Sequence, residues 1–250
     1  MTQDKRVALV TGGSRGLGRG IVIALANSGF DVAFTYNTDI EAAERVLKET
    51  RYVKGKILAF KMNVGSRSSI KTTIESITRE YREINILVNN AGIAQEKPFE
   101  TITDDDWKNM LNINLQGPFS LIQEIIPSMV ARKWGRIINI SSIGGQWGGF
   151  NQVHYAAAKA GLINLTQSIA KIYSKHGITS NAIAPGLIST DMAEAELNSE
   201  AGKDKVKGIP MNRIGTVEDV GLSVAFLSSD DSSYITGQTI NLNGGMFFST

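Results

Sequence analysis

Tyr155 and Lys159 are the residues of this 250-residue chain whose types and spacing best suit proton chemistry. On a helix, side chains four positions apart share one face, so the Lys159 ammonium would lie beside the phenol. A neighbouring cation favours the phenolate and lowers the pKa of a tyrosine from its usual value near 10. Such a tyrosine can donate or accept a proton near neutral pH. Upstream, Ser142 ends a predicted strand, and its hydroxyl can hold the oxygen of a carbonyl group.

The spacing alone also fits a simpler interpretation, a buried tyrosine beside a lysine that reaches solvent. Tyr52 and Lys56 have the same spacing within a charged connection, where a surface role is expected. Around Tyr155, in contrast, alanines and Gly161 leave room for another molecule to pack closely. The strand that ends at Ser142 also points to the edge where α/β sheets bind ligands.

A second candidate site is the glycine-rich turn that follows the apolar run Val7–Val10. A strand that leads through glycines into a helix directs backbone N–H groups and the positive end of the helix dipole toward one point. The spacing is G-x-x-x-G-x-G, which differs from the G-x-G-x-x-G of standard dinucleotide folds. A tight turn without a ligand is the alternative. The residues predicted to approach a diphosphate are Gly12, Ser14, Arg15, Gly16, Leu17 and Gly18.

The same turn also matches G-x-S-x-G, the nucleophile elbow of serine hydrolases, with Ser14 as the nucleophile. Three features weaken this alternative. The elbow follows the first strand, and Arg15 stands where a hydrolase would expose its serine. The chain has only two histidines, His154 and His176, and neither has an obvious place at a late strand end.

The end of the second predicted strand indicates which dinucleotide is preferred. NAD-binding enzymes carry an acidic residue there for the ribose 2′-hydroxyl. This chain has Tyr36 and Asn37 instead, and Asp39 comes later, where we expect the next helix. Arg15 offers a cation that suits a 2′-phosphate. The sequence therefore favours NADP(H).

Composition excludes several other classes of function. Lys and Arg total 26 against 24 Asp and Glu, so no strong positive field indicates nucleic-acid binding. The chain has no cysteine and two histidines, which argues against disulfides and metal sites. No stretch approaches the roughly 20 apolar residues of a membrane span. We expect a soluble, cytoplasmic protein.

Short apolar runs alternate with helix-like segments along the whole chain, which predicts an α/β fold with a parallel sheet and helices on both faces. Thr38, Thr103 and Thr216 each begin a pattern typical of a capping box. With no linker or repeat, a single domain over residues 1–250 is expected. The seven predicted strands are Val7–Val10, Val32–Phe34, Ile57–Phe60, Ile84–Val88, Ile137–Ile140, Ala182–Ala184 and Ile240–Leu242.

Two segments depart from this regular pattern. Pro118 and Pro127 fall within an apolar stretch, so the helix there should be kinked or interrupted. Residues 191–215 are polar and rich in Ala, Lys and Glu, which suggests a helical lid over the edge of the sheet.

Taken together, these residues resemble the short-chain dehydrogenase/reductase family over essentially the whole chain. The resemblance implies a Rossmann-like doubly wound sheet of about seven parallel strands. It implies that Tyr155 is the acid/base, Lys159 lowers its pKa, Ser142 orients the substrate carbonyl, and Asn114 holds a water for a proton relay. Beyond the glycine turn, Tyr36 and Asn37, the cofactor residues that it implies are Asn63, Val64, Asn90, Ala91, Gly92, Tyr155, Lys159, Pro185, Gly186, Ile188 and Thr190. The family usually has Asp-Val where this chain has Asn63-Val64, so altered cofactor affinity is expected.

Within the family, the segments around Ser142 and Tyr155 are similar to those of NADPH-dependent reductases of 3-oxoacyl thioesters, whose acyl group is carried by a carrier protein or by CoA. The resemblance implies a homotetramer and an acidic carrier protein that docks at cations such as Arg132 and Lys133. Bulky Trp147 and Phe150 keep a second substrate class open, a cyclic alcohol, a sugar or another small ketone; they could also pack against the lid. A non-catalytic NADPH-binding protein is a further alternative.

His154 directly precedes Tyr155 and could be considered a base. As a neighbour on the same helix it should point elsewhere, so we interpret it as a contact to the lid or to another subunit.

Overall fold

The computed structural model describes residues 5–189 and 206–248, and its framework is a sheet of seven strands. All neighbouring strands run parallel, in the order β3-β2-β1-β4-β5-β6-β7. Each strand lies where a short apolar run predicted one, so the expected fold class is confirmed. The strands are β1 (Val7–Val10), β2 (Asp31–Tyr36), β3 (Ile57–Lys61), β4 (Ile86–Asn89), β5 (Gly135–Ile140), β6 (Ile178–Pro185) and β7 (Thr239–Leu242).

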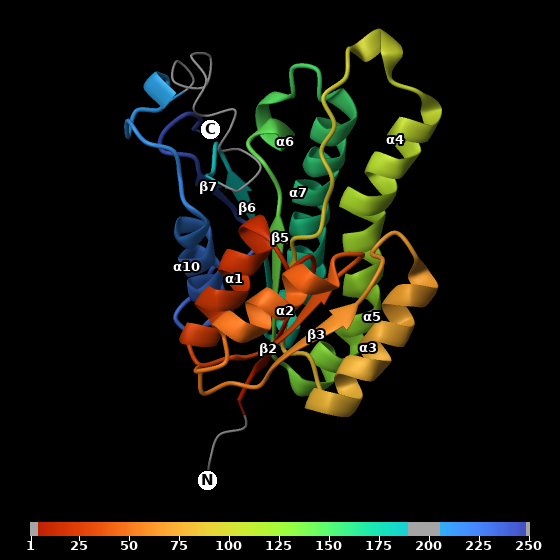
Figure 1. Cartoon of the computed structure of the whole chain (residues 1–250), viewed down its shortest axis with the longest axis vertical. Helices are drawn as coiled ribbons and strands as arrows, with labels where there is room; N and C mark the ends of the chain where they lie inside the picture. The colour runs from red at the N-terminus through yellow and green to blue at the C-terminus, as the bar shows by residue number, and fades with distance from the viewer. Residues whose placement is uncertain (1–4, 190–205, 249–250) are drawn as a thin grey trace.

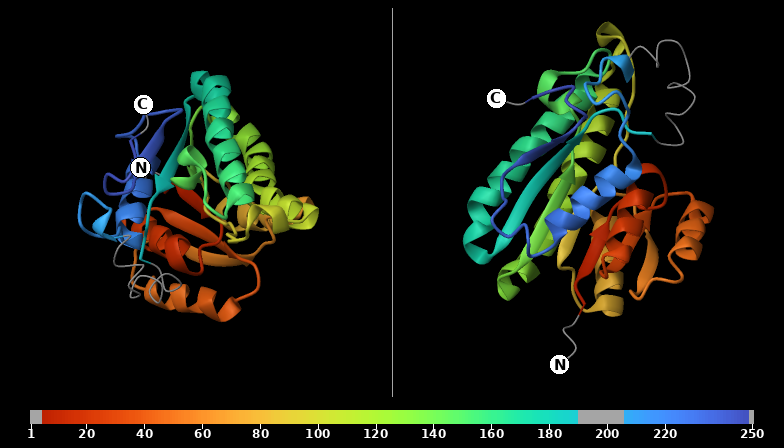
Figure 2. Two further views of the ribbon diagram at one scale, coloured as in Figure 1. Left: turned by 90° about the horizontal axis from the view of Figure 1, so that it is seen from above. Right: turned by 90° about the vertical axis from the view of Figure 1, so that its left-hand side faces the viewer.

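Helices cover both faces of this sheet (Figures 1 and 2). One apolar core lies between the sheet and α1 (Gly16–Asn27), α2 (Ile40–Glu49) and α10 (Val217–Ser228). The other lies beneath α3 (Arg67–Tyr81), α5 (Gly117–Arg132) and α7 (Val153–Tyr173). Shorter elements are η1 (Phe99–Thr101), α4 (Asp104–Leu111), η2 (Asn112–Gln116), α6 (Gly144–Trp147) and η3 (Ser174–His176).

Central strand β1 explains why the predicted strands are continuous apolar runs and do not alternate with polar residues. All four of its residues are buried. Val7 and Leu9 contribute to one core, and Ala8 and Val10 contribute to the other. A strand covered on both faces has no side that favours polar residues.

The strand order reverses between β1 and β4, which pair with each other at the centre of the sheet. In open α/β sheets, such a reversal separates the loops that follow the two strands and leaves a crevice at their carboxyl ends. The glycine-rich turn follows β1, and the segment with Ser142 follows β5. The topology therefore brings the predicted functional residues to one edge of the sheet.

Two of the three predicted capping boxes are present. Thr103 with Asp106 begins α4, and Thr216 with Asp219 begins α10, each with both reciprocal bonds. The prediction for Thr38 is wrong. Asp39 caps α2 and accepts a hydrogen bond from the Ala42 backbone N–H at 2.8 Å. The carboxylate is as good an acceptor for a helix N-terminus as the hydroxyl one residue earlier, and it also places Asp39 at the start of the helix, not inside it.

The predicted irregularity in the helix around the prolines is present but takes an unexpected form. Between α4 and α5 the chain makes one π-helical turn, η2. Pro118 lies in the first turn of α5, whereas Pro127 lies inside α5, which continues to Arg132. The interruption therefore precedes the first proline, and the second causes no break.

Of the predicted lid, residues 206–215 are described, and residues 191–205 lie outside the described part. The described portion is fastened to neighbouring segments: the Met211 N–H donates to the Gly244 carbonyl at 3.1 Å, and Ile188 forms a parallel bridge with Gly215. Across the described ranges, no helix has the length and apolarity needed to cross a membrane. Within the same ranges, no group of acidic or histidine side chains has the arrangement of a metal site.

Candidate active site

The glycine-rich turn after β1 is shaped for close approach to its backbone. Gly12 and Gly16 have φ angles of +64° and +51°, in the left-handed region that favours glycine. A Cβ atom on Gly18 would overlap the Gly12 carbonyl. Side chains at these positions would therefore distort the turn.

The amino end of α1 fits an anionic group. Arg15 is the N-cap residue, its side chain makes no capping hydrogen bond, and the first turn, which includes Leu17, has no acidic residue. Backbone N–H groups at a helix start need acceptors, and here the protein supplies none from these side chains. A diphosphate would satisfy them and the helix dipole together, so this turn fits the predicted dinucleotide.

The segment after β4 holds the glycine turn in place. The Asn90 side-chain amide donates to the carbonyls of Thr11 and Gly12 at 2.9 and 3.1 Å. In return, the Thr11 hydroxyl accepts the backbone N–H groups of Asn90 and Ala91 at 3.0 and 2.9 Å. The structure thus brings two sequence-predicted cofactor segments together.

The carboxyl end of β2 offers no carboxylate to a ribose. Tyr36 is the last residue of the strand and is half-buried, and Asn37 is exposed. The strand lies beside the glycine turn, because the Gly13 N–H donates to the Thr35 carbonyl at 2.8 Å. Asp39 is occupied as the cap of α2. Exposed Arg15 supplies the cation that a 2′-phosphate would need.

Asn63 and Val64, which follow β3, are also at this edge of the sheet. The Asn63 side-chain oxygen accepts the Gly65 N–H at 2.9 Å, so it is occupied within its own turn. Val64 packs against the start of α5 at Gly117. Where the family usually has a carboxylate, this chain therefore has a neutral amide whose oxygen is already bonded within its own turn.

The three central residues come together after β5 and on the first turns of α7. The Ser142 side chain lies close enough to Tyr155 to favour the ionised form of its hydroxyl. Nζ of Lys159 lies 5.6 Å from the centre of the Tyr155 ring and donates to the Ile140 carbonyl at 2.8 Å. A Cβ on Gly145 would collide with the Lys159 backbone, so glycine there allows the Ser142 loop to approach α7.

Burial controls the ionisation of this group. It lowers the pKa of Lys159 to about 8, because the ammonium is removed from water. Burial also raises the pKa of Tyr155, and the nearby Ser142 side chain only partly opposes this. The sequence led us to expect a lowered tyrosine pKa beside lysine, but in the structure the effect of burial is larger. A tyrosine in this state stays protonated at neutral pH.

Asn114 lies in η2 and is 1% exposed. Its side-chain amide donates to the Ile93 carbonyl at 3.0 Å and accepts the Ile93 N–H at 3.2 Å. A Cβ on Gly92 would meet both the Asn114 side-chain oxygen and Nζ of Lys159. Pro118 has no N–H, so the Asn114 carbonyl lacks the donor that an α-helix would provide four residues later.

The segment after β6 forms another part of this edge. The Ile143 N–H donates to the Pro185 carbonyl at 3.0 Å, and the Gly186 N–H donates to the Leu242 carbonyl at 3.0 Å. Ile188 is buried further along the segment. Thr190, the remaining predicted cofactor residue, lies outside the described residues.

Aromatic side chains line the segment between Ser142 and Tyr155. Trp147 is 52% exposed and meets the Phe247 ring edge-on, with the ring centres 5.8 Å apart. Phe150 is 94% exposed. Trp147 thus packs against the C-terminal segment, a contact that could not be found from the sequence because the two rings are 100 residues apart.

His154 is not available to another subunit, and most of the predicted lid, residues 191–205, lies outside the described residues. The His154 side chain is fully buried, and Nε2 lies 2.8 Å from Oε1 of Gln95 in the loop after β4. Sequence reasoning missed Gln95 because no motif marks it. Only the packing of that loop against α7 brings the two side chains together.

Arg132 and Lys133 lie at the opposite end of the sheet from this site. Arg132 donates to the Ile84 carbonyl at 2.7 Å and pairs with Glu83 at 3.2 Å. Lys133 precedes β5, whereas Ser142 follows it. A six-residue strand spans roughly 20 Å, so these cations do not line the site of their own chain.

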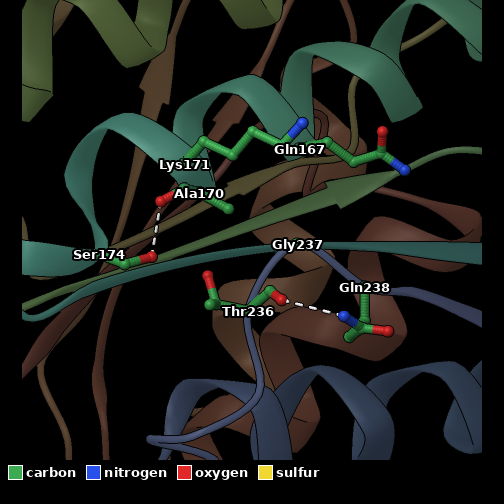
Figure 3. Close-up of a pocket in the computed structure, with 7 residues that line it drawn as sticks. All are labelled: Gln167, Ala170, Lys171, Ser174, Thr236, Gly237 and Gln238. Carbon is green, nitrogen blue, oxygen red and sulfur yellow. Dashed lines mark hydrogen bonds between the residues drawn. The ribbon is translucent and has the colours of Figure 1, made fainter.

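A separate pocket of about 340 Å³ lies between the second half of α7 and the segment before β7 (Figure 3). Lys171 and Gln167 extend across one side, and Thr236 and Gln238 lie on the other. None of the predicted site residues lines this pocket.

The chain is similar to known proteins over nearly its whole length. The family model described as "Enoyl-(Acyl carrier protein) reductase" matches residues 12–247. The 3-oxoacyl-[acyl-carrier-protein] reductase FabG of Staphylococcus aureus is 41% identical over 240 residues, 96% of this chain and 97% of the relative. The protein of the same name from Haemophilus influenzae is 38% identical over 244 residues, 98% of this chain and 99% of the relative. The acetoacetyl-CoA reductase of Shinella zoogloeoides is 41% identical over 243 residues, 97% of this chain and 99% of the relative.

Proposed function

Because the chain belongs to the short-chain dehydrogenase/reductase family and is therefore an oxidoreductase of CH–OH and C=O groups, we propose that it reduces a 3-oxoacyl thioester to the 3-hydroxyacyl thioester with NADPH. The observation that carries this proposal is the assembly of Ser142, Tyr155, Lys159 and Asn114 beside a glycine turn that fits a dinucleotide.

The cofactor would be held along the carboxyl edge of the sheet. The uncapped start of α1 suits the diphosphate, Arg15 and the end of β2 suit the 2′-phosphate, and Asn90 braces the turn. Pro185 and Gly186 complete the nicotinamide side. When bound, NADPH supplies a hydride to the carbonyl carbon.

Ser142 and Tyr155 act on the carbonyl oxygen of the substrate. Each hydroxyl can donate a hydrogen bond to that oxygen, which fixes its position and stabilises the negative charge that develops on it. Tyr155 then transfers its proton to the oxygen. Its raised pKa supports this role, since the phenol is protonated at neutral pH.

Lys159 and Asn114 would restore that proton. Lys159 is buried and has a pKa of about 8, so it can exchange a proton with Tyr155 near neutral pH. Since Pro118 cannot donate to the Asn114 carbonyl, that oxygen is suited to accept a hydrogen bond from water. We propose that this water supplies protons to Lys159.

The substrate class is proposed from the relatives together with the aromatic side chains. Trp147 and Phe247 form an apolar contact on the segment that leads from Ser142 to Tyr155. An acyl chain could pack along these rings, which supports a thioester over a polar sugar. A cyclic ketone remains the second candidate, because the same rings would stack on it.

Rates of NADPH oxidation with acetoacetyl-CoA, a panel of cyclic ketones and keto-sugars test this proposal, with NADH as the comparison cofactor. Rapid oxidation of NADPH with acetoacetyl-CoA is expected. If only ring ketones are reduced, the substrate is a cyclic ketone and not a 3-oxoacyl thioester. Tight NADPH binding without any turnover would support a non-catalytic binding protein.

The wider assembly is proposed from the resemblance. We propose a cytoplasmic homotetramer with one domain over residues 1–250. Because Arg132 and Lys133 lie at the far end of β5, a carrier protein docked there would serve the site of a neighbouring subunit.

A further inference from the structure

The loop after β4 is fastened to the segment that leads into α7, next to the candidate active site. His154 contacts Gln95 at 2.8 Å. The Lys97 backbone N–H donates to the Asn151 carbonyl at 2.7 Å. Asn151 has a φ of +55°, a left-handed conformation that asparagine tolerates better than most residues. The backbone is thus turned locally where it meets Lys97.

The start of α7 lacks a cap of its own. Gln152 is the N-cap residue, and its side chain makes no capping bond but donates to Glu96 at 3.2 Å. Tyr155 is the third residue of this helix, in the turn that frays first when a helix start is unsupported. The bonds to the loop therefore hold the start of this helix against its neighbours, although none of them accepts a free N–H group of the first turn.

The direction of the bond between His154 and Gln95 can be assigned. The Gln95 amide nitrogen donates to a carboxylate oxygen of Asp106 at 3.2 Å, and a carboxylate only accepts. Oε1 of Gln95 therefore faces His154, whose Nε2 must carry the hydrogen. Asp106 is held in turn by Lys97, whose ammonium keeps the pKa of that carboxyl well below its usual range. Nδ1 of His154 is buried and has no partner in the described part of the chain.

The same loop also holds Asn114. Ile93, two residues before Gln95, makes both hydrogen bonds to the Asn114 side chain. One short stretch of backbone therefore contacts the π-helical turn at one end and the helix start that carries Tyr155 at the other. The loop sets the relative position of the two.

We propose that His154 and Gln95 are positioning residues for the reaction: their hydrogen bond holds the first turn of α7 so that Tyr155 faces Ser142. His154 does not act on the substrate as a base, because its Nε2 donates to Gln95. The inference rests on the proposed function, since it assigns Tyr155 the proton transfer.

Two substitutions at His154 separate the hydrogen bond from the volume of the side chain. His154→Phe keeps a ring but removes the N–H, and His154→Gln restores an N–H donor. Because small misplacements of a reacting group are costly, kcat of His154→Phe should fall roughly 10- to 100-fold. NADPH affinity should stay within about twofold, and His154→Gln should recover most of the loss. Gln95→Met removes the acceptor at a half-buried position, and its loss of kcat should equal that of His154→Phe. This second variant keeps the test possible if His154→Phe does not fold.

Tyr81→Phe is the matched control. The buried Tyr81 hydroxyl donates to the Val32 and Lys56 carbonyls at 3.1 Å each, on the side of the sheet near β3, so its loss should reduce stability without changing kcat. Amide hydrogen exchange without cofactor gives a second measurement: residues 156–159, whose N–H groups bond to carbonyls at the start of α7, should exchange faster in His154→Phe than in wild type.

The positioning role is refuted by a His154→Phe kcat within twofold of wild type, by a His154→Gln loss as large as that of His154→Phe, or by an equal kcat loss in Tyr81→Phe. A wild-type protein that reduces no 3-oxoacyl thioester contradicts the proposed function instead. In that case unchanged exchange at residues 156–159 still refutes the positioning role, and faster exchange supports it.

Discussion

Replacing Lys159 with methionine should make the protein more stable while it abolishes turnover. The lysine side chain is 5% exposed, and no carboxylate pairs with it in the described residues. Burial lowers its pKa from 10.5 to about 8. Since each pKa unit corresponds to about 1.4 kcal/mol, keeping the ammonium in this site at pH 7 costs roughly 3 kcal/mol.

Methionine has a similar length and carries no charge, so Lys159→Met removes that cost. It also removes the hydrogen bond to the Ile140 carbonyl, a loss of about 1 kcal/mol. The net expectation is a gain of about 2 kcal/mol at pH 7. For a protein of this size, that corresponds to a rise in Tm of about 4–8 °C.

The gain should depend on pH with a defined sign. The pKa of Lys159 is lower in the folded state than in the unfolded state, so between pH 8 and 10.5 the unfolded wild-type chain binds more protons. The stability of the wild-type protein therefore rises across this range, and the stability advantage of Lys159→Met becomes smaller. Urea unfolding of both proteins at pH 7 and near pH 10, at one protein concentration, measures it. The reasoning would be refuted if Lys159→Met were less stable than wild type at pH 7. It would also be refuted if the difference in free energy of unfolding were the same at both pH values.

Four further substitutions test separate parts of the site. Tyr155→Phe should lower kcat by several orders of magnitude and leave NADPH affinity nearly unchanged in a binding titration; retained turnover would remove Tyr155 from the acid role. Tyr36→Asp should shift the ratio of kcat/KM for NADPH and NADH toward NADH, because a carboxylate repels the 2′-phosphate. An unchanged ratio would show that residue 36 does not lie next to the ribose of the bound cofactor. Trp147→Ala should lower kcat/KM roughly tenfold for long 3-oxoacyl chains but little for acetoacetyl-CoA, since it removes apolar contact. Ser14→Ala should only weaken NADPH binding, whereas a serine hydrolase would lose all activity.

The strands could be predicted from the sequence because each is a short apolar run that the sheet buries on both faces. The helix start at Thr38 could not, since the adjacent Asp39 offers an equally good cap and the choice depends on where the backbone leaves β2. The prolines indicated an irregular helix. The π-helical turn before Pro118 carries Asn114, whose side chain bonds to Ile93 in a distant loop, and no local pattern reveals this contact.

For the site, motifs identified the residues that surround the glycine turn and Tyr155, because their chemistry needs fixed spacings. Side chains that support them were missed or misplaced. The sequence does not reveal that His154 contacts a loop nearly 60 residues earlier in the chain. The predicted docking residue Lys133 is separated from Ser142 by the whole length of β5. Such contacts depend on tertiary packing and leave no periodic signal.

Transfer of deuterium from NADPH labelled at C4 of the nicotinamide to C3 of the product tests the central claim most directly. With acetoacetyl-CoA as substrate, mass spectrometry of the 3-hydroxybutyryl-CoA product should find one deuterium at that carbon when the wild-type protein is used and the transferred C4 position is labelled. Tyr155→Phe should form almost no labelled product. An unlabelled product with NADPH labelled at either face of C4, or equal labelling by Tyr155→Phe at an unchanged rate, would contradict hydride transfer assisted by this tyrosine.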